Sequence, residues 1–265
     1  MTYQPVIPIG GVAGWAFLQR TRATQQSAFD ASPAIQRDTA YFAQSIGDVT
    51  TAQQLTDDRR LLKVALGAFG LDGDIGNKYF IRKVLEDGSL DSTALAQKLS
   101  DKRYLEFSRA FGFGDYATPS TQISDFGTKI VSAYKERQFE IAVGAQDQDL
   151  RLAIGLSRDL GEILNKTTTP DGMWYSVMGN PPLRKVFETA LGLPPTFGAL
   201  DLGQQLSGFR DKARAAFGDS EIAQFSNPEN ASALNRLFLA RSQINAGQGS
   251  LSGGAIALML LSGAS

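Results

Sequence analysis

The composition of this chain restricts the catalytic chemistry that it can perform. Its 265 residues include no cysteine and no histidine. The chain therefore lacks a thiolate nucleophile, thiolate metal ligands, and the commonest general base and metal ligand of enzymes. Catalytic triads that rely on histidine are excluded. Only carboxylate, lysine, tyrosine and serine chemistry remains.

One pair of residues has the spacing of a serine nucleophile and a lysine base. Ser132 and Lys135 form an S-x-x-K sequence, which places a hydroxyl and an amine on one helical face, as in serine acylases of the β-lactamase type. The S-D-N and K-T-G sequences that accompany it in those enzymes are missing here, and those folds need a sheet. We therefore interpret the pair as ordinary helical residues.

A glycine-rich stretch matches the dinucleotide-binding fingerprint in its letters alone. Gly112-x-Gly114-x-x-Ala117 has the required spacing, but that motif must follow a strand and open a helix. Here a helical pattern over Tyr104–Phe111 precedes it. The stretch is predicted to be a helix end, and we expect no cofactor.

Two aspartates begin a sequence that looks like a calcium loop. Asp72-x-Asp74 supplies the first two ligand positions. Asn77 and Lys83 stand where such a loop requires a glycine and a bidentate glutamate. The stretch is predicted to be a turn between helices, and we expect no metal.

The charges of the chain nearly cancel. Its 26 basic and 27 acidic side chains give a net charge of -1, with no run of five or more like charges. No long-range positive field attracts nucleic acid, so we expect no nucleic-acid partner. A mean hydropathy of -0.14 is typical of a globular protein, and the length fits one or two domains.

Helical signals dominate the chain. Ser32-Pro33, Asn180-Pro181 and Asn227-Pro228 each place a capping residue before a proline at the first helical position, and Thr51 with Gln54 has capping-box spacing. Apolar stripes at helical spacing follow, among them Leu202, Leu206, Phe209, Ala213, Ala216 and Phe217, ended by Gly218, and Leu234, Leu237, Phe238 and Ile244. No segment alternates with period two for long. We predict an all-α fold of about ten to twelve short-to-medium helices, with helix content above about 55%.

A short pattern recurs along the chain. Ala68–Leu71, Ala110–Phe113 and Ala190–Leu193 each read as a helix end, a glycine and an apolar residue, and Ala153–Leu156 is a fourth match. Two interpretations remain open. The pattern is either a common glycine stop with its hydrophobic contact or the trace of duplicated helical hairpins.

The last residues differ from the rest in composition. We expect a helical body over residues 1–245, with a subdivision near 115–120, and a flexible Gly/Ser-rich tail over 246–265. The tail carries an apolar run, Ala255–Leu261, which is too short for a membrane span of about 20 residues. Because apolar residues are unfavourable in water, this run should dock on the body of the protein, on a partner or on another copy. Of these, we predict a separable binding element that uses Ile256, Leu258, Met259, Leu260 and Leu261.

The first residues are apolar but carry no lysine or arginine before Arg20. A secretory signal needs a basic segment at its start, so we expect none. The predicted location is the cytoplasm, or export without a cleavable signal peptide.

Several longer stretches carry a resemblance to a known family. They are GWAFLQRT, SPAIQRDTAYF, TDDRRLLKVALGAFGL, NKYFIRKVLEDG and LSDKRYLEFSRAFGFGD. With them, about residues 10–245 resemble a bacterial family of unknown function whose genes commonly lie in flagellar gene clusters. The resemblance implies an all-helical protein connected with flagellar assembly or motility, and it supplies no catalytic residues. We do not expect the long terminal heptads of flagellar axial proteins, because the first helix is interrupted at Ser32-Pro33 and the chain ends in a Gly/Ser tail.

Three functional hypotheses follow. The first is a non-enzymatic structural or accessory protein of the flagellum that acts through protein–protein contacts, with flagellar components or a second copy as its partner. The second is a cytoplasmic flagellar export chaperone or regulator. The third is a hydrolase that uses Ser132 and Lys135.

Overall fold

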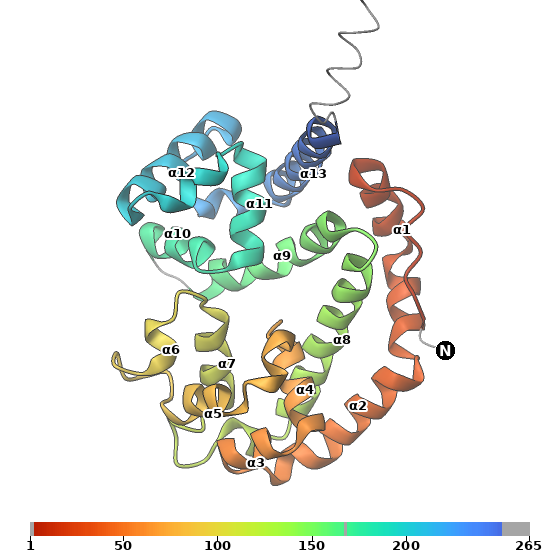
Figure 1. The fold of residues 1–265 in the computed structure, drawn as a ribbon, viewed down its shortest axis with the longest axis vertical. Coiled ribbons are helices and arrows are strands. Elements are labelled where there is room, and N and C mark those ends of the chain that lie inside the picture. The colour runs from red at the N-terminus through yellow and green to blue at the C-terminus, as the bar shows by residue number, and fades with distance from the viewer. Residues whose placement is uncertain (1–2, 167–168, 251–265) are drawn as a thin grey trace, which may run out of the picture. The chain divides into compact units, whose positions relative to one another are not determined.

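A computed structural model describes residues 3–166 and 169–250 and confirms the all-α prediction (Figure 1). The structure is 76% helical, and the described residues contain 13 α-helices and no strand. They form two compact units. Unit 1 consists mainly of Leu18–Gln146, and unit 2 of Pro8–Phe17, Asp147–Met178 and the chain from Pro182 onward. None of the described helices is both long and apolar enough to cross a bilayer.

Unit 1 is organised around helix α4. Its α-helices are α1 (Gly11–Asp30, from Leu18 on), α2 (Pro33–Ser45), α3 (Ala52–Asp57), α4 (Arg59–Ala68), α5 (Lys78–Glu86), α6 (Leu95–Lys98), α7 (Arg103–Phe111) and α8 (Phe126–Gly144). Three 3-10 helices join them: η1 (Ile46–Asp48), η2 (Asp72–Gly76) and η3 (Ser120–Gln122). Helix α4 packs against α2 and α8, and its residues 61–62 and 64–68 are all buried.

Besides the first turns of α1, unit 2 contains five α-helices around an aromatic core. They are α9 (Gln148–Lys166), α10 (Pro170–Met178), α11 (Pro181–Leu191), α12 (Leu202–Phe217) and α13 (Pro228–Ser250), with 3-10 helices η4 (Pro195–Ala199) and η5 (Ile222–Ser226). Trp174 is fully buried, stacks on Phe209 at 5.3 Å between ring centroids and meets Phe187 edge-on.

Hydrogen bonds confirm the predicted start of α3 and cap the start of α4. Thr51 and Gln54 form a complete capping box at the start of α3. Asp58 caps α4 by accepting from the backbone N–H groups of Arg60 and Leu61. Ser32 precedes Pro33 as predicted, but its hydroxyl makes no capping bond.

The recurring glycine pattern marks real helix ends at three of its four positions. Gly70, Gly112 and Gly192 have φ angles of 69°, 68° and 67°, in the left-handed region that favours glycine. These glycines follow α4, α7 and α11. At the end of α4, Leu71 N–H donates to the carbonyl of Leu66, and at the end of α11, Leu193 N–H donates to that of Glu188. The fourth glycine, in Ala153–Leu156, lies inside α9, so that match is no helix end.

The division of the chain does not fall near 115–120, where we expected it. The long central part of unit 1 ends at Gln146, and unit 2 resumes at Asp147. The stretch after Gly112 stays within unit 1 because its side chains bind the turn after α2. Thr121 donates to the carbonyl of Val49 at 2.6 Å, and Gln122 to that of Gly47 at 2.7 Å.

The helical region also extends past residue 245, contrary to the expected boundary of the tail. Helix α13 continues to Ser250 through the Gly/Ser-rich sequence. The predicted partner-binding residues Ile256, Leu258, Met259, Leu260 and Leu261 lie outside the described residues.

Candidate functional site

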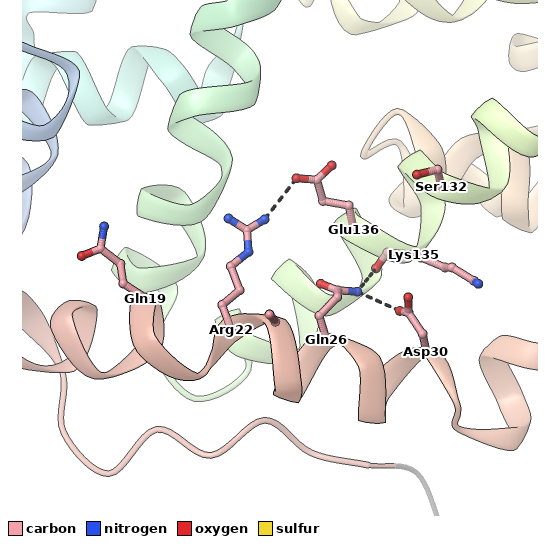
Figure 2. A pocket seen from close by; sticks show the side chains of 8 residues that line it. Gln19, Arg22, Gln26, Asp30, Ser132, Lys135 and Glu136 are labelled. Atoms are coloured by element: carbon pink, nitrogen blue, oxygen red, sulfur yellow. Dashed lines mark hydrogen bonds and ion pairs between the residues drawn. The ribbon is translucent and has the colours of Figure 1, made fainter. Parts of the chain in front are cut away.

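Ser132 and Lys135 lie on helix α8 beside a groove of about 450 Å³ between α1 and α8 (Figure 2). Both residues line this groove, as their spacing on one helical face predicts. The Ser132 residue is exposed, and no hydrogen bond joins it to Lys135 among the described residues. In Figure 2 the Lys135 side chain extends away from the rest of the lining. The pair shares a helical face but is not arranged as a nucleophile and its base.

The groove is held together by polar contacts that sequence reasoning missed. Arg22 of α1 forms an ion pair with Glu136 of α8 at 3.1 Å. Gln26 donates to the backbone carbonyl of Lys135 at 3.2 Å and to Asp30 at 2.8 Å. These contacts tie α1 to α8. The lining therefore contains both positively and negatively charged side chains, as well as neutral hydrogen-bonding groups. In the sequence, the only available signal was the i, i+4 spacing of Arg22 and Gln26, which places both side chains on one face of α1.

The aspartates of the calcium-like sequence are engaged in contacts between elements. Asp74 accepts from the hydroxyl of Tyr104 at 2.6 Å and from Asn77 at 2.8 Å, and Asp72 accepts from Gln138 at 2.7 Å. Burial and the bond to Asp74 raise the pKa of Tyr104 to about 12. No cluster of three or more metal-ligating side chains occurs in the described part of the chain. These carboxylates hold η2 to α7 and α8.

The dinucleotide-like stretch is a compact turn after helix α7. Gly112 is the left-handed end of that helix, and a Cβ atom at Gly114 would lie 2.3 Å from the carbonyl oxygen of Glu86. Glycine is therefore needed for close backbone packing. The element before the motif is a helix, so the stretch does not have the strand–turn–helix setting of a dinucleotide site.

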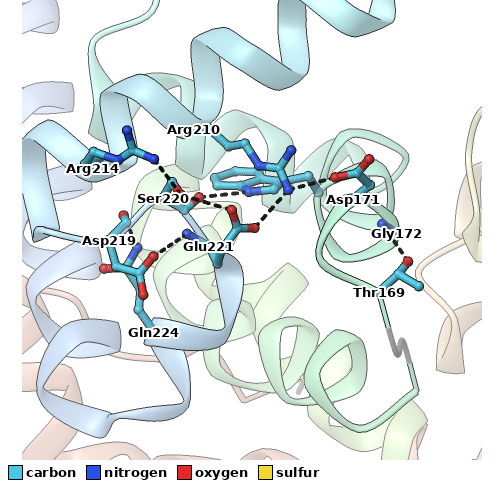
Figure 3. Close-up of polar contacts among 10 residues, drawn as sticks. Thr169, Asp171, Gly172, Arg210, Arg214, Asp219, Ser220, Glu221 and Gln224 are labelled. Atoms are coloured by element: carbon cyan, nitrogen blue, oxygen red, sulfur yellow. Dashed lines mark hydrogen bonds and ion pairs between the residues drawn. The ribbon is translucent and has the colours of Figure 1, made fainter.

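A second polar cluster, in unit 2, has the arginine of α12 at its centre (Figure 3). One terminal nitrogen of Arg210 lies 2.7 Å from Asp171 and 3.1 Å from Glu221. The hydrogen bond to Glu221 raises the pKa of the guanidinium despite its partial burial, and the bond to Asp171 adds to this effect. Next to it, Trp174 donates to the carbonyl of Ser220 at 3.0 Å. The cluster joins α10, α12 and the loop before η5, and its carboxylates are already paired.

The described surface also carries large apolar side chains in both units. Those that are more than a third exposed are Val6, Ile9, Val12, Tyr79, Leu90, Tyr116, Ile123, Tyr175, Leu200, Leu202 and Ile244. Leu202 and Ile244 were predicted on buried stripes, but they are 60% and 57% exposed. Leu202 is the first residue of α12, a turn before its packed face begins.

Ile244 is exposed because helix α13 outruns the elements that cover its earlier turns. Residues 243–247 are all exposed, and the helix continues to Ser250. We call residues 243–250 the α13 arm. A single helix end in water is marginally stable, and glycines weaken it further. At the base of the arm, Gln243 lies against Gly11 of α1.

Comparison with known proteins identifies the family. The sequence profile described as a protein of unknown function (DUF1217) matches residues 68–231. The chain belongs to the DUF1217 family. No curated protein matches it. The crystal structure of protein AGR_C_984 from Agrobacterium tumefaciens has a similar fold, with a TM-score of 0.73 and 22% identity over 91% of this chain and 99% of that one. At this identity the likeness concerns the fold.

The DUF1217 match contains some of the candidate sites and not others. It includes Ser132, Lys135 and the Arg210 cluster, but neither the α1 side of the groove nor the α13 arm. The predicted membership of a family of unknown function is confirmed. Family membership assigns no role to any of these residues.

Proposed function

We propose that this DUF1217 protein is a non-enzymatic structural or accessory protein of the bacterial flagellum that acts through protein–protein contacts. The flagellar part of the proposal rests on the resemblance of about residues 10–245 to a family whose genes lie in flagellar clusters. The DUF1217 match to residues 68–231 is consistent with that resemblance.

The proposal that the protein acts through protein–protein contacts rests on the exposure of the α13 arm. Its residues 243–247 are exposed, and they include Ile244, an aliphatic side chain that is 57% exposed on a helix. Exposed apolar surface on a helix end is typical of elements that dock on another protein. We propose that the arm and the apolar residues after it, Ile256, Leu258, Met259, Leu260 and Leu261, form the partner-binding element.

The geometry of the Ser132 pair gives the hydrolase hypothesis no support. The Ser132 residue is exposed beside Lys135 without a bond to it, and a serine nucleophile needs a positioned base. The proposal therefore assigns Ser132 no catalytic role. A Ser132→Ala variant that folds normally should keep full biological function.

Cell fractionation tests the proposal and separates it from a role as an export chaperone or regulator. The native protein is traced by immunoblotting in purified flagella and in cytosol, and the motility of a deletion strain is measured. We expect the protein in the flagellar fraction and reduced motility after deletion. Retention in cytosol with reduced motility would favour the chaperone or regulator. Normal motility of the deletion strain and no association with flagella would overturn the flagellar proposal.

A further inference from the structure

The exposed residues of helix α4, around which unit 1 is organised, are all cationic. Arg59, Arg60 and Lys63 are exposed, whereas every other residue of α4 is buried. Helix α2 packs beside α4 (Figure 1) and exposes a further arginine, Arg37. We call Arg37, Arg59, Arg60 and Lys63 the basic face of unit 1.

Two contacts show that Arg37 lies on the side of α2 that borders the exposed residues of α4. Asp38 of α2 forms an ion pair with Lys63 at 2.6 Å, and the guanidinium of Arg60 lies 4.5 Å from the centroid of the Tyr41 ring. Arg37 precedes Asp38 and stands one helical turn before Tyr41, so it lies on the same side of α2. The cations of the two helices therefore form one patch.

The three arginines of this patch differ from most other arginines of unit 1 because they form no ion pair. Elsewhere in unit 1, arginines typically pair with a carboxylate, as Arg22 does with Glu136. Within the part of the chain that the structure describes, no carboxylate forms an ion pair with Arg37, Arg59 or Arg60. Their guanidinium groups are therefore available to carboxylates of another molecule.

Arg60 is held in place before any partner binds. The Asp58 carboxylate accepts from the backbone N–H groups of Arg60 and Leu61 and from the hydroxyl of Tyr41 at 2.5 Å. The Tyr41 ring, fixed in this way, packs against the Arg60 guanidinium. A stacked guanidinium keeps its N–H groups, which point outward in its plane, for hydrogen bonds. Because the side chain is already ordered, binding through it costs less conformational entropy.

The arrangement of these groups fits a short acidic segment. A guanidinium binds a carboxylate through two parallel hydrogen bonds. Packed helices lie about 8–10 Å apart, a distance that two or three residues of an extended chain span at about 3.3 Å per residue. A segment with several acidic residues can therefore contact Arg37 on α2 and Arg59 and Arg60 on α4 together.

Carboxylates within the patch disfavour nucleic acid and anionic membranes as the partner. Asp38 and Asp58 lie beside the cations and would repel the phosphates of DNA, which carries one charge per about 1.7 Å. Membrane-binding polybasic segments contain about four to eight cations, and the net charge of -1 adds no long-range attraction. A protein segment can instead place its few carboxylates between these two aspartates.

We propose that the basic face of unit 1 docks an acidic segment of a partner protein. Arg37, Arg59 and Arg60 bind its carboxylates, and Lys63 neutralises Asp38. This inference deepens the proposed function and rests on its claim that the protein acts through protein–protein contacts. It adds a charged binding surface to the apolar surface of the α13 arm.

The first test measures peptide binding to the purified full chain by fluorescence anisotropy at low ionic strength. The probe is a labelled peptide of alternating glutamate and glycine, and the blank has glutamine in place of glutamate. We expect the glutamate peptide to bind and the glutamine peptide not to bind. Arg59→Gln with Arg60→Gln should weaken binding by about fivefold or more, because two charge-assisted contacts are lost, and Arg37→Gln by about twofold or more.

The matched control is Arg20→Gln with Lys98→Gln, which removes two exposed positive charges of unit 1 on α1 and α6. It should weaken binding by less than about twofold, through the change in net charge alone. No binding of the glutamate peptide to the wild type, or equal weakening by the control and by Arg59→Gln with Arg60→Gln, would overturn the proposal. Tighter binding of a DNA duplex or of phosphatidylserine vesicles, lost in the same variant, would overturn it in favour of a phosphate ligand.

The second test asks whether Tyr41 positions Arg60 for binding. Tyr41→Phe keeps the ring against the guanidinium, whereas Tyr41→Leu removes it. With folding checked by circular dichroism, the leucine variant should weaken peptide binding by about twofold or more, and the phenylalanine variant should bind like the wild type. Equal binding by both variants would contradict the ordered Arg60 on which the proposal depends. Both tests use purified protein and a peptide, so they can fail while the flagellar proposal stands, and the reverse.

Discussion

The Trp174 core and the α13 arm lie in the same unit, but their apolar residues have opposite surroundings. Trp174 is fully buried, with Phe209 and Phe187 against its ring and the carbonyl of Ser220 bound to its N–H group. Ile244 is 57% exposed on a helix that runs past its neighbours. Burial within the chain therefore accounts for the apolar residues of the Trp174 core. For the α13 arm, we propose a surface on another protein.

The comparison separates residues that stabilise the fold from residues that are available for binding. Substitution in the Trp174 core should change the free energy of unfolding and affect association only through folding. Substitution in the arm should do the reverse. The following predictions test this separation, from the largest expected effect to the smallest.

Trp174→Ala should destabilise unit 2 most. Truncation of a buried tryptophan removes apolar burial and leaves a cavity, and it typically lowers the free energy of unfolding by about 3–5 kcal/mol. Urea unfolding followed by circular dichroism measures this. Tyr175→Ala is the matched control, because Tyr175 is 42% exposed, and it should cost far less. Equal losses for the two variants would contradict the assignment of Trp174 to the core.

In unit 1, removal of the Asp58 carboxylate should have an intermediate effect on the free energy of unfolding. This carboxylate accepts two backbone N–H groups at the start of α4 and the hydroxyl of Tyr41. Asp58→Ala should lower the free energy of unfolding by about 1–2 kcal/mol. Its neighbour Asp57, which is 59% exposed and paired with Arg82, gives the control Asp57→Ala. That variant should lose less than about 1 kcal/mol.

Tyr104 makes a smaller contribution to the free energy of unfolding, and this contribution depends on pH. Its pKa is raised to about 12 by burial and by the bond to Asp74, whereas an unfolded tyrosine titrates near about 10. The folded state holds the proton more tightly, so this stabilisation is complete below about pH 10 and is lost as the pH rises toward 12. The free energy of unfolding should therefore fall less between pH 8 and pH 11 in Tyr104→Phe than in the wild type.

The Tyr104→Phe variant should still lose some stability as the pH rises, because burial also raises the pKa of Tyr134. The double variant Tyr104→Phe with Tyr134→Phe should have the flattest profile of the three. An unchanged slope in the single variant would mean that Tyr104 is not protected as its contacts indicate.

Ile244→Gln should have the smallest effect on folding. Its side chain is already 57% exposed, and surface substitutions usually change stability by less than about 0.5 kcal/mol. Thermal unfolding at low protein concentration, where association is negligible, measures this. A loss comparable to that of Asp58→Ala would place Ile244 in the fold and remove it from the binding surface.

Local sequence signals predicted the helices better than they predicted the sites. Helix α12 spans Leu202–Phe217, as predicted, because its apolar period and the glycine that follows it, Gly218, are both local signals. The Arg210 cluster was missed because Asp171 lies 39 positions away in the chain, and only tertiary packing brings the two together.

The most direct test of the central claim is the free energy of unfolding of the chain truncated after Asn245, compared with the full chain at a concentration where both are monomeric. The residues removed include the last turn of the α13 arm and the predicted binding residues 256–261. If the arm and the residues after it serve binding, the two values should agree within about 0.5 kcal/mol, and the truncated chain should no longer associate at higher concentration. A loss of several kcal/mol on truncation would show that these residues belong to the folded core and would contradict the account.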